Sequence, residues 1–219
     1  MRNILFIFFV GISNLAFSQT IAQIDSVSNV FCDYLKQSDI KNDTLKISSL
    51  YNEQFNPYLR KIDQSKVQKI GKQLFYRLQR NCLEFSELLD RLEPPKEAIV
   101  RITEKPTSEI SRKQLKQFKN QKDFYYLEVA GDTTNVVMQD GFWTDSFSDK
   151  TFSKLTYNWI NDTEFELTFI ESNNESRSNF SVKGDIYVYQ VLSKEDGFYF
   201  MSVHIPGQKT YDKFKIYYK

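Results

Sequence analysis

Apolar residues recur at two different spacings along this chain, and the change of spacing divides it in two. Between residues 21 and 92 they return every three or four positions, which predicts helices with one buried face. From Phe124 onward they alternate with polar residues, as in residues 165–169, which predicts strands with one buried face. Because no helical pattern separates successive strands, an antiparallel arrangement is favoured over a parallel sheet. The predicted fold class is α+β, with an N-terminal three-helix bundle followed by a C-terminal antiparallel β-meander that forms an open sheet or a small barrel.

The first two helices of the predicted bundle are bounded by polar residues. The first should end near Gln37, and Asn42 or Asp43 can cap the second. Pro57 lies inside the second helical pattern. Because proline lacks an amide hydrogen and crowds the preceding turn, a kink or break is expected around Asn56.

The third helix is predicted to be long and continuous, from a cap at Asp63 or Ser65 to Leu92. Pro94 and Pro95 stop it. The prediction depends on an unbroken stripe at steps of three and four, made of Val67, Ile70, Leu74, Leu78, Cys82, Phe85, Leu89 and Leu92.

Turn residues mark the ends of the predicted strands. Asp140-Gly141 and Asp196-Gly197 are the strongest hairpin signals, and Gly184 suggests a bend within one strand. The expected strands are 124–129, 134–139, 142–147, 151–160, 164–172, 180–192, 197–205 and 211–218.

The charge of the chain is distributed unevenly. Residues 19–122 hold nineteen basic and thirteen acidic side chains, and residues 123–219 hold nine and fifteen, so the halves carry +6 and −6. Much of the positive charge lies in residues 101–122, where a short helix is expected from about Ser108 to Lys119. We interpret this basic connector as a solvated helix face or as a segment lying against the acidic sheet, and no nucleic-acid partner is expected.

The first eighteen residues have the pattern of an export signal. Arg2 precedes the apolar run Ile4–Val10, and Ala16-Phe17-Ser18 supplies small residues for cleavage after Ser18. A retained membrane anchor is the alternative, but the apolar stretch is shorter than the roughly 20 residues of a membrane span. The predicted organisation is therefore a signal peptide at 1–18, a helical domain at 19–93, a basic connector at 94–122 and an antiparallel β domain at 123–219. The mature protein is expected to be periplasmic or secreted, without a stable membrane span.

The two cysteines are candidates for a disulfide bond. Cys82 lies on the stripe of the third helix and Cys32 lies beside Phe31 on the first, so antiparallel packing could bring them together. An oxidising compartment favours the bond, and the alternative is two separately buried thiols.

Few residues suggest catalysis or metal binding. His204 is the only histidine, and no motif of a known catalytic type accompanies it. Asp140, Asp145 and Asp149 cluster around Trp143 but match no calcium-loop spacing. No glycine-rich phosphate loop is present. We therefore expect no cofactor, no metal site and no catalytic residue.

The predicted sheet is rich in aromatic residues. Their first interpretation is the filling of a thin core. The second is a cup that binds an apolar or ring-bearing ligand, lined by Trp143, Tyr157, Trp159, Tyr187 and Tyr189.

Residues 143–219 carry a resemblance to other proteins, at Ser153-Lys154-Leu155, Trp159-Ile160-Asn161-Asp162, Leu167-Thr168-Phe169-Ile170 and Lys183-Gly184-Asp185. This segment resembles a loose group of exported bacterial proteins of unknown function, typical of the Bacteroidota. The resemblance implies export and a C-terminal β-meander, and it transfers no catalytic motif.

These observations favour a non-enzymatic exported protein that binds a small apolar molecule or an envelope protein through its aromatic sheet. Two alternatives stay open: a carboxylate-dependent cell-envelope hydrolase that uses Asp140, Asp145 or Asp149, and a two-part periplasmic adaptor whose helices and sheet bind different proteins.

Overall fold

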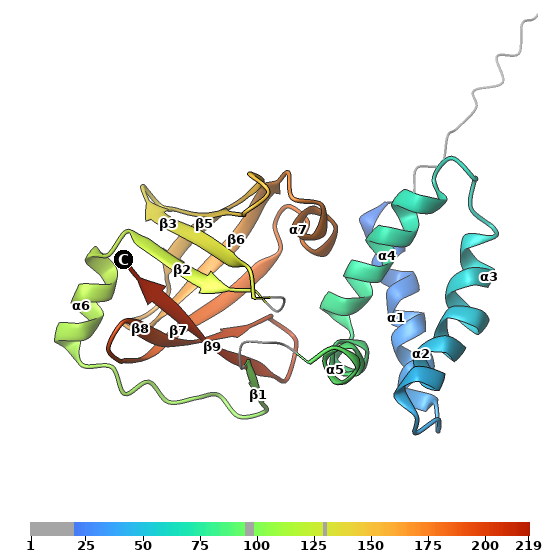
Figure 1. Cartoon of the computed structure of the whole chain (residues 1–219), viewed down its shortest axis with the longest axis horizontal. Coiled ribbons are helices and arrows are strands. Elements are labelled where there is room, and N and C mark those ends of the chain that lie inside the picture. The colour runs from blue at the N-terminus through green and yellow to red at the C-terminus, as the bar shows by residue number, and fades with distance from the viewer. Residues whose placement is uncertain (1–19, 95–98, 129–130) are drawn as a thin grey trace, which may run out of the picture.

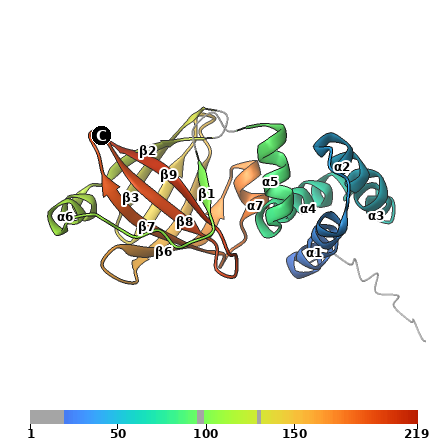
Figure 2. The same cartoon turned by 90° about the horizontal axis from the view of Figure 1, so that it is seen from below.

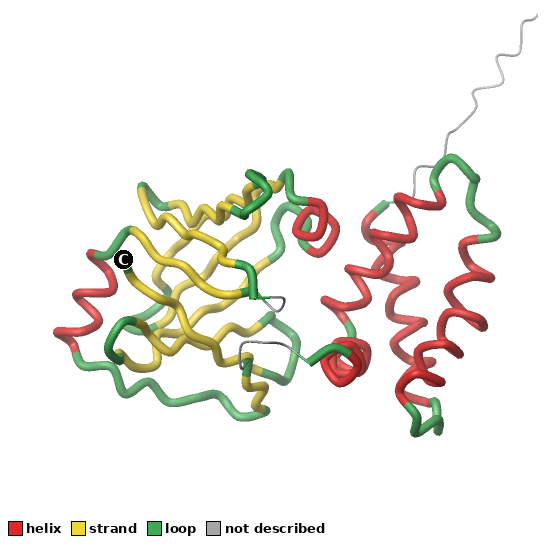
Figure 3. The backbone as a smooth tube through the Cα atoms, in the orientation of Figure 1, coloured by secondary structure: helices red, strands yellow, loops and turns green. Residues whose placement is uncertain are grey.

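The computed structural model describes residues 20–94, 99–128 and 131–219, and it combines helices with an antiparallel β-barrel (Figure 1). The helices of residues 21–92 lie at one end of the molecule, and the barrel, with two further short helices, lies at the other (Figure 3). The predicted signal peptide and its cleavage after Ser18 lie outside the described residues. Within the described residues, no helix has the length and apolar character needed to cross a membrane.

The helical part of the protein, residues 21–92, is divided more finely than the three expected helices. Thr20 and Asn42 cap its first two helices, because each side chain accepts a hydrogen bond from a backbone N–H of the first turn. The segments are α1 (Ile21–Gln37), α2 (Asp43–Leu50), the π-helical turn η1 (Tyr51–Phe55), α3 (Asn56–Leu59), α4 (Val67–Asn81) and α5 (Leu83–Leu92).

The second helical pattern is irregular near Pro57, as expected. The turn η1 has the wider π-helical spacing, and Pro57 lies in the first turn of α3. The backbone stays helical through this turn, since Asn56 donates its N–H to the carbonyl oxygen of Tyr51 five residues earlier, so the helix widens before Pro57 and does not break.

The prediction of one continuous third helix up to Leu92 was wrong. The backbone of Cys82 is extended, with φ −120° and ψ 104°, so the helix ends at Asn81 and a new one begins at Leu83. The start differs as well, because Asp63 binds the amide of Ser65 in a turn and α4 begins only at Val67. The apolar stripe continues across the break because both α4 and α5 bury it, so periodicity alone did not reveal the break.

The alternating half of the chain closes into an eight-stranded antiparallel barrel, so the choice between an open sheet and a barrel is decided (Figure 2). Strand β9 pairs with both β8 and β2, which joins the two ends of the meander. The barrel strands are β2 (Asp123–Leu127), β3 (Thr133–Gln139), β4 (Phe142–Ser146), β5 (Phe152–Trp159), β6 (Glu164–Ser172), β7 (Ile186–Lys194), β8 (Phe198–His204) and β9 (Tyr211–Tyr218).

The hairpin between β3 and β4 confirms its sequence signal. Asp140 and Gly141 have φ values of 52° and 77°, and two successive positive φ angles are typical of the turn that Asp-Gly favours.

One predicted strand was wrong in its first half. Residues 175–180 form the short helix α7 (Glu175–Phe180), and β7 starts only at Ile186. Asn174 caps α7 by accepting a hydrogen bond from the amide of Arg177, and Gly184 has a φ of 94° in the turn before the strand. The cap at Asn174 followed by Glu175 was the sequence signal for this helix.

The connector wraps the outside of the barrel. It begins with the short strand β1 (Val100–Ile102), which pairs with β9 and was not predicted, and ends with α6 (Arg112–Asn120), which Ser111 caps. Arg101 forms an ion pair with Asp212 of β9, and Lys105 forms one with Glu164 of β6. These two pairs support the interpretation that the connector lies against the acidic sheet.

A buried arginine connects the helices to the barrel. Arg77 of α4 is 3% exposed and donates to Asp25 of α1, to Asp185 before β7 and to the carbonyl oxygen of Phe180. Arg80 adds a second ion pair to Asp185, at 3.2 Å. The end of the barrel that faces α4 and α7 is called the mouth below, and the end that α6 covers is called the base (Figure 1).

Candidate functional site

Aromatic rings fill the interior of the barrel around Phe165 of β6, which is fully buried. Its ring centroid lies 5.0 Å from that of Trp159 and 5.5 Å from that of Tyr189. Trp143 and Tyr157 contact it at 6.1 and 6.2 Å. The strand alternation turns all these side chains inward, and ring pairs at such distances pack favourably.

All five predicted ligand-binding residues belong to the apolar core of the barrel. Trp143, Tyr157, Trp159 and Tyr189 have their rings around Phe165, whereas the contacts of the Tyr187 side chain with Ser181 and Arg80 lie toward the mouth. The hydroxyl group of Tyr187 is bonded to Ser181 at 2.5 Å, and the guanidinium of Arg80 lies 5.4 Å from its ring centroid. Binding of a ligand by these five residues stays a prediction.

The base of the barrel is closed by a side chain from outside the sheet. Phe118 of α6 is fully buried, and its ring lies 5.1 Å from that of Phe124 and 5.0 Å from that of Tyr199. Trp159 and Phe165 surround it at 6.2 Å. Sequence reasoning did not name Phe118, although Leu115 and Phe118 are spaced three apart in the expected helix, as residues on one helix face are.

Beside this plug lies a small open pocket of about 260 Å³. Tyr157 and Trp159 form part of its wall, together with Lys119, Gln121 and Met138. The ammonium of Lys119 lies 4.0 Å from the ring centroid of Trp159, close enough for a cation–π interaction. The pocket thus gives solvent an approach to two of the predicted residues.

The mouth of the barrel holds charged groups. Arg177 of α7 donates to Glu128 at 2.5 Å, and Thr134 of β3 donates to the same carboxylate at 2.7 Å. The guanidinium of Arg177 also lies 5.4 Å from the ring centroid of Phe147. A pocket of about 390 Å³ opens over these groups and reaches Tyr76 of α4.

Asp145 of β4 points into the barrel next to this charged group and is 7% exposed. Its carboxylate accepts a hydrogen bond from the indole N–H of Trp143 at 2.8 Å. Burial raises the pKa of Asp145 from 3.8 to about 6, against the opposing effect of the positive charge on Arg177. At neutral pH the carboxyl group is therefore mostly ionised, although it binds a proton more readily than an exposed aspartate does.

Replacing Asp145 with Asn is expected to stabilise the protein at pH 7.5. The folded protein binds a proton on Asp145 more tightly than the unfolded chain does, so the free energy of unfolding falls as the pH rises from 3.8 to about 6 and stays lower above that. The shift corresponds to a gain of about 1 to 3 kcal/mol for Asp145→Asn at pH 7.5 and to little change near about pH 4. Urea denaturation of both proteins at the two pH values measures this, and an equal effect at both would contradict it.

The three aspartates of the predicted carboxylate cluster do not meet. Asp140 lies in the β3–β4 turn beside the base pocket, whereas Asp149 lies at the rim of the mouth pocket and accepts hydrogen bonds from Thr151. Asp145 lies inside the barrel. Within the described residues, no three histidine, cysteine or acidic side chains are grouped so that they could hold a metal ion.

His204 ends strand β8. Its ring stacks on Tyr211 at 4.7 Å, and its Nδ1 lies 3.2 Å from the carbonyl oxygen of Thr210. These contacts place His204 as a sheet residue near the mouth.

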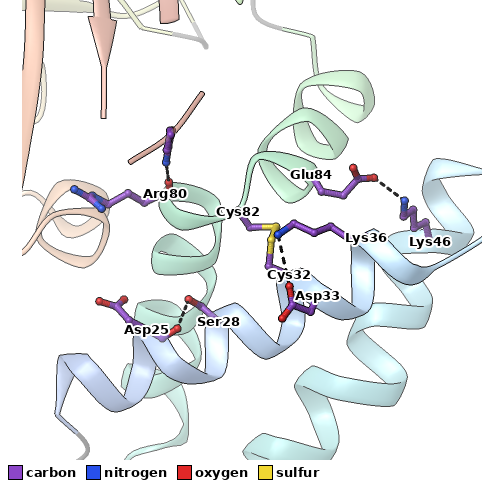
Figure 4. Close-up of a disulfide and its surroundings, with 10 residues drawn as sticks. Asp25, Ser28, Cys32, Asp33, Lys36, Lys46, Arg80, Cys82 and Glu84 are labelled. Carbon is purple, nitrogen blue, oxygen red and sulfur yellow. Dashed lines mark hydrogen bonds and ion pairs between the residues drawn. A yellow bond between two sulfur atoms is a disulfide. The ribbon is translucent and has the colours of Figure 1, made fainter. Parts of the chain in front are cut away.

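The predicted disulfide bond between Cys32 and Cys82 is present (Figure 4). It joins α1 to the break between α4 and α5, with the two Cα atoms 5.5 Å apart. Both residues are buried in the core of the helical part. The bond crosslinks two segments of the helical part and contacts none of the barrel residues described above.

Comparison with protein-family models, with curated proteins and with solved structures found no match to this chain. The function must therefore be inferred from the geometry of the site itself.

Proposed function

We propose that this protein is an exported, non-enzymatic binding protein whose barrel takes a small ring-bearing molecule at the position that Phe118 now occupies. The observation that carries the proposal is the environment of Phe118. Its ring enters the barrel from a separate helix and is surrounded by Phe124, Trp159, Phe165 and Tyr199. A planar apolar ligand would make the same contacts.

The attachment of α6 supports an exchange of this kind. The helix has nine residues, and only Leu115 and Phe118 among them are buried. Its polar contact with the barrel is peripheral, since Lys194 donates to Gln117 at 3.0 Å between exposed side chains, and Gln121, just after the helix, donates to the carbonyl oxygen of Lys219 at 3.0 Å. A segment held by few buried contacts opens at low free-energy cost.

Export is supported by two features of different origin. The sequence predicts a signal peptide before residue 19, and the disulfide bond is of a kind that persists in oxidising compartments. We therefore infer that the protein acts in the periplasm or outside the cell.

Titration with indole tests the proposed function. Wild-type protein should bind indole weakly, because Phe118 competes for the same space, and Phe118→Ala should bind it about 10-fold more tightly, because the competitor is gone. Isothermal titration calorimetry measures both affinities. Phe198→Ala is the matched control, since Phe198 lies on β8 with its ring packed against Phe200 and Tyr217 outside the interior cluster.

Three results would overturn the proposal. If Phe118→Ala binds indole and the wild type does not, the cavity is a product of the substitution. If neither protein binds indole, or if Phe198→Ala gains as much affinity as Phe118→Ala, the interior is only a packed core.

A further inference from the structure

The mouth pocket is separate from the plugged base and has a different chemistry. It lies where α7 and α4 approach the barrel (Figures 1 and 2). Tyr76 and Gln79 of α4 form one side, and Phe147 and Phe180 contribute rings to the walls. At about 390 Å³, the pocket has room for a small organic molecule.

The charges in the walls of this pocket are mostly negative. Glu128, Asp132 and Asp149 face a single base, Arg177. Glu128 and Arg177 form an ion pair with each other, so their charges offset. Among the described residues, Asp132 and Asp149 form no ion pair, and Lys150, which follows Asp149, is exposed and is not part of the wall.

A buried carboxylate adds to this field from inside the barrel. Asp145 is 7% exposed, and its one hydrogen bond comes from the neutral indole of Trp143. Among the described residues it forms no ion pair. The groups that interact with it electrostatically are Arg177 and Glu128 at the pocket and the hydroxyl groups of Tyr126 and Tyr189. Burial of a carboxylate is costly, and a positive charge in the adjoining pocket would reduce that cost further than Arg177 does by itself.

The arrangement of the wall residues favours an organic cation over a metal ion. A metal ion needs several ligands around one point, and the described residues contain no such group. The acids are instead spread over walls that also contain aromatic rings, and Phe147 already lies within 5.4 Å of the guanidinium of Arg177. Rings and dispersed carboxylates together are the surroundings that alkylammonium groups prefer.

We propose that the mouth pocket binds an organic ammonium ion, such as an alkyl amine, between the barrel and helix α4. This site is independent of the ring-binding site proposed at the base.

Calorimetric titration of the mature chain, residues 19–219, with 1,5-diaminopentane tests the proposal. Two molecules of similar length serve as comparisons, the neutral 1,5-pentanediol and the anionic glutarate. We expect the diamine to bind, the diol and glutarate not to bind, and the affinity for the diamine to fall as the salt concentration rises.

Variants locate the site. Asp132→Asn and Asp149→Asn each remove one charge from the wall and should weaken diamine binding by about 3- to 10-fold. Asp149→Asn keeps the oxygen that accepts the hydrogen bonds from Thr151. Asp162→Asn is the control, because it makes the same change of net charge in the exposed turn between β5 and β6, away from the pocket.

The proposal is overturned if the diamine does not bind, if the diol or glutarate binds as well as the diamine, or if Asp162→Asn weakens binding as much as the two pocket variants. None of these outcomes depends on indole binding, so this site and the proposed function at the base can fail separately.

Discussion

Replacing both Cys32 and Cys82 with Ala is expected to lower the free energy of unfolding by about 4 kcal/mol. The disulfide closes a loop of 50 residues, and by the chain-entropy model a loop of that length restricts the unfolded chain by about that amount. The loop contains α2, α3 and α4, so the loss should be largest for the helical part. Both cysteines are at most 4% exposed, and alanine keeps the site apolar without introducing an unpaired hydroxyl group.

Urea denaturation followed by far-ultraviolet circular dichroism measures this loss. Dithiothreitol provides the control, because it should destabilise the wild type by a similar amount and leave the double variant unchanged. A variant that unfolds within about 1 kcal/mol of the wild type would show that the bond adds little to the packing around it.

Arg77→Met should destabilise the protein by about 3 kcal/mol, because it removes the cation that Asp25 and Asp185 share and leaves Asp185 with Arg80 alone. Asp25 and Asp185 both lose hydrogen bonds of 2.6 Å, and Asp185 has a side chain that is only 14% exposed. The carboxylate of Asp25 is 29% exposed and can be partly hydrated, which keeps the loss at the lower end for a broken buried pair. Methionine fills much of the same volume, so the effect reports on charge more than on packing.

The same change should separate two unfolding transitions. Arg77 connects α1 and α4 to the turn before β7, so its loss weakens the link between helices and barrel. Scanning calorimetry should show one transition for the wild type and two for Arg77→Met. Arg60→Met on the exposed end of α3 is the control and should change neither the stability nor the number of transitions. A single, unshifted transition for Arg77→Met would contradict the role given to this residue.

A double-mutant cycle tests whether Asp185 is the partner through which Arg77 links the helices to the barrel. Asp185→Asn removes the carboxylate that both Arg77 and Arg80 contact. If the Arg77–Asp185 pair carries the coupling, Arg77→Met should cost less in the Asp185→Asn background than in the wild type.

The predictions that the structure confirms rest on interactions between residues close together in the sequence. The Asn42 cap, the Asp140-Gly141 hairpin and the alternation of β6 each express a preference that a few consecutive residues carry. The disulfide was predictable for a related reason, because a regular helical spacing placed Cys32 and Cys82 near buried faces.

The predictions that failed concern places where local preference and packing differ. Cys82 continues the apolar stripe, yet its backbone is extended, and the stripe is buried on both sides of the break. The strand predicted from residue 180 starts only at Ile186, because α7, which Asn174 caps, extends to Phe180 and a turn follows it. Most of the predicted stripe is buried, although Leu88 is buried without belonging to it and Val67 lies outside the core cluster. In both cases periodicity missed the change in backbone direction.

The candidate sites were also predicted only in part, because local patterns indicate which side chains are buried but not which distant segments meet. Alternation identified Trp143, Tyr157, Trp159 and Tyr189 as side chains of one dry face, but it did not show that Phe118 of a separate helix lies among the rings. The mouth pocket joins residues of α4, α7 and the β2–β3 turn, which lie more than 40 positions apart in the chain. No local pattern connects such residues, so only their positions in space reveal the shared charge of the pocket.

By itself, the amino-acid sequence determined the types of most helices and strands, the buried face of each and the pairing of the cysteines, because these follow from the 3.6- and 2-residue periods and from turn chemistry. Tertiary structure alone decided that β9 closes the barrel, that Phe118 plugs its base and that Arg177 meets Glu128 above Asp145 at its mouth. The closure of the barrel and the insertion of Phe118 depend on strand twist, connector length and packing along the whole chain. No short segment of sequence contains this information.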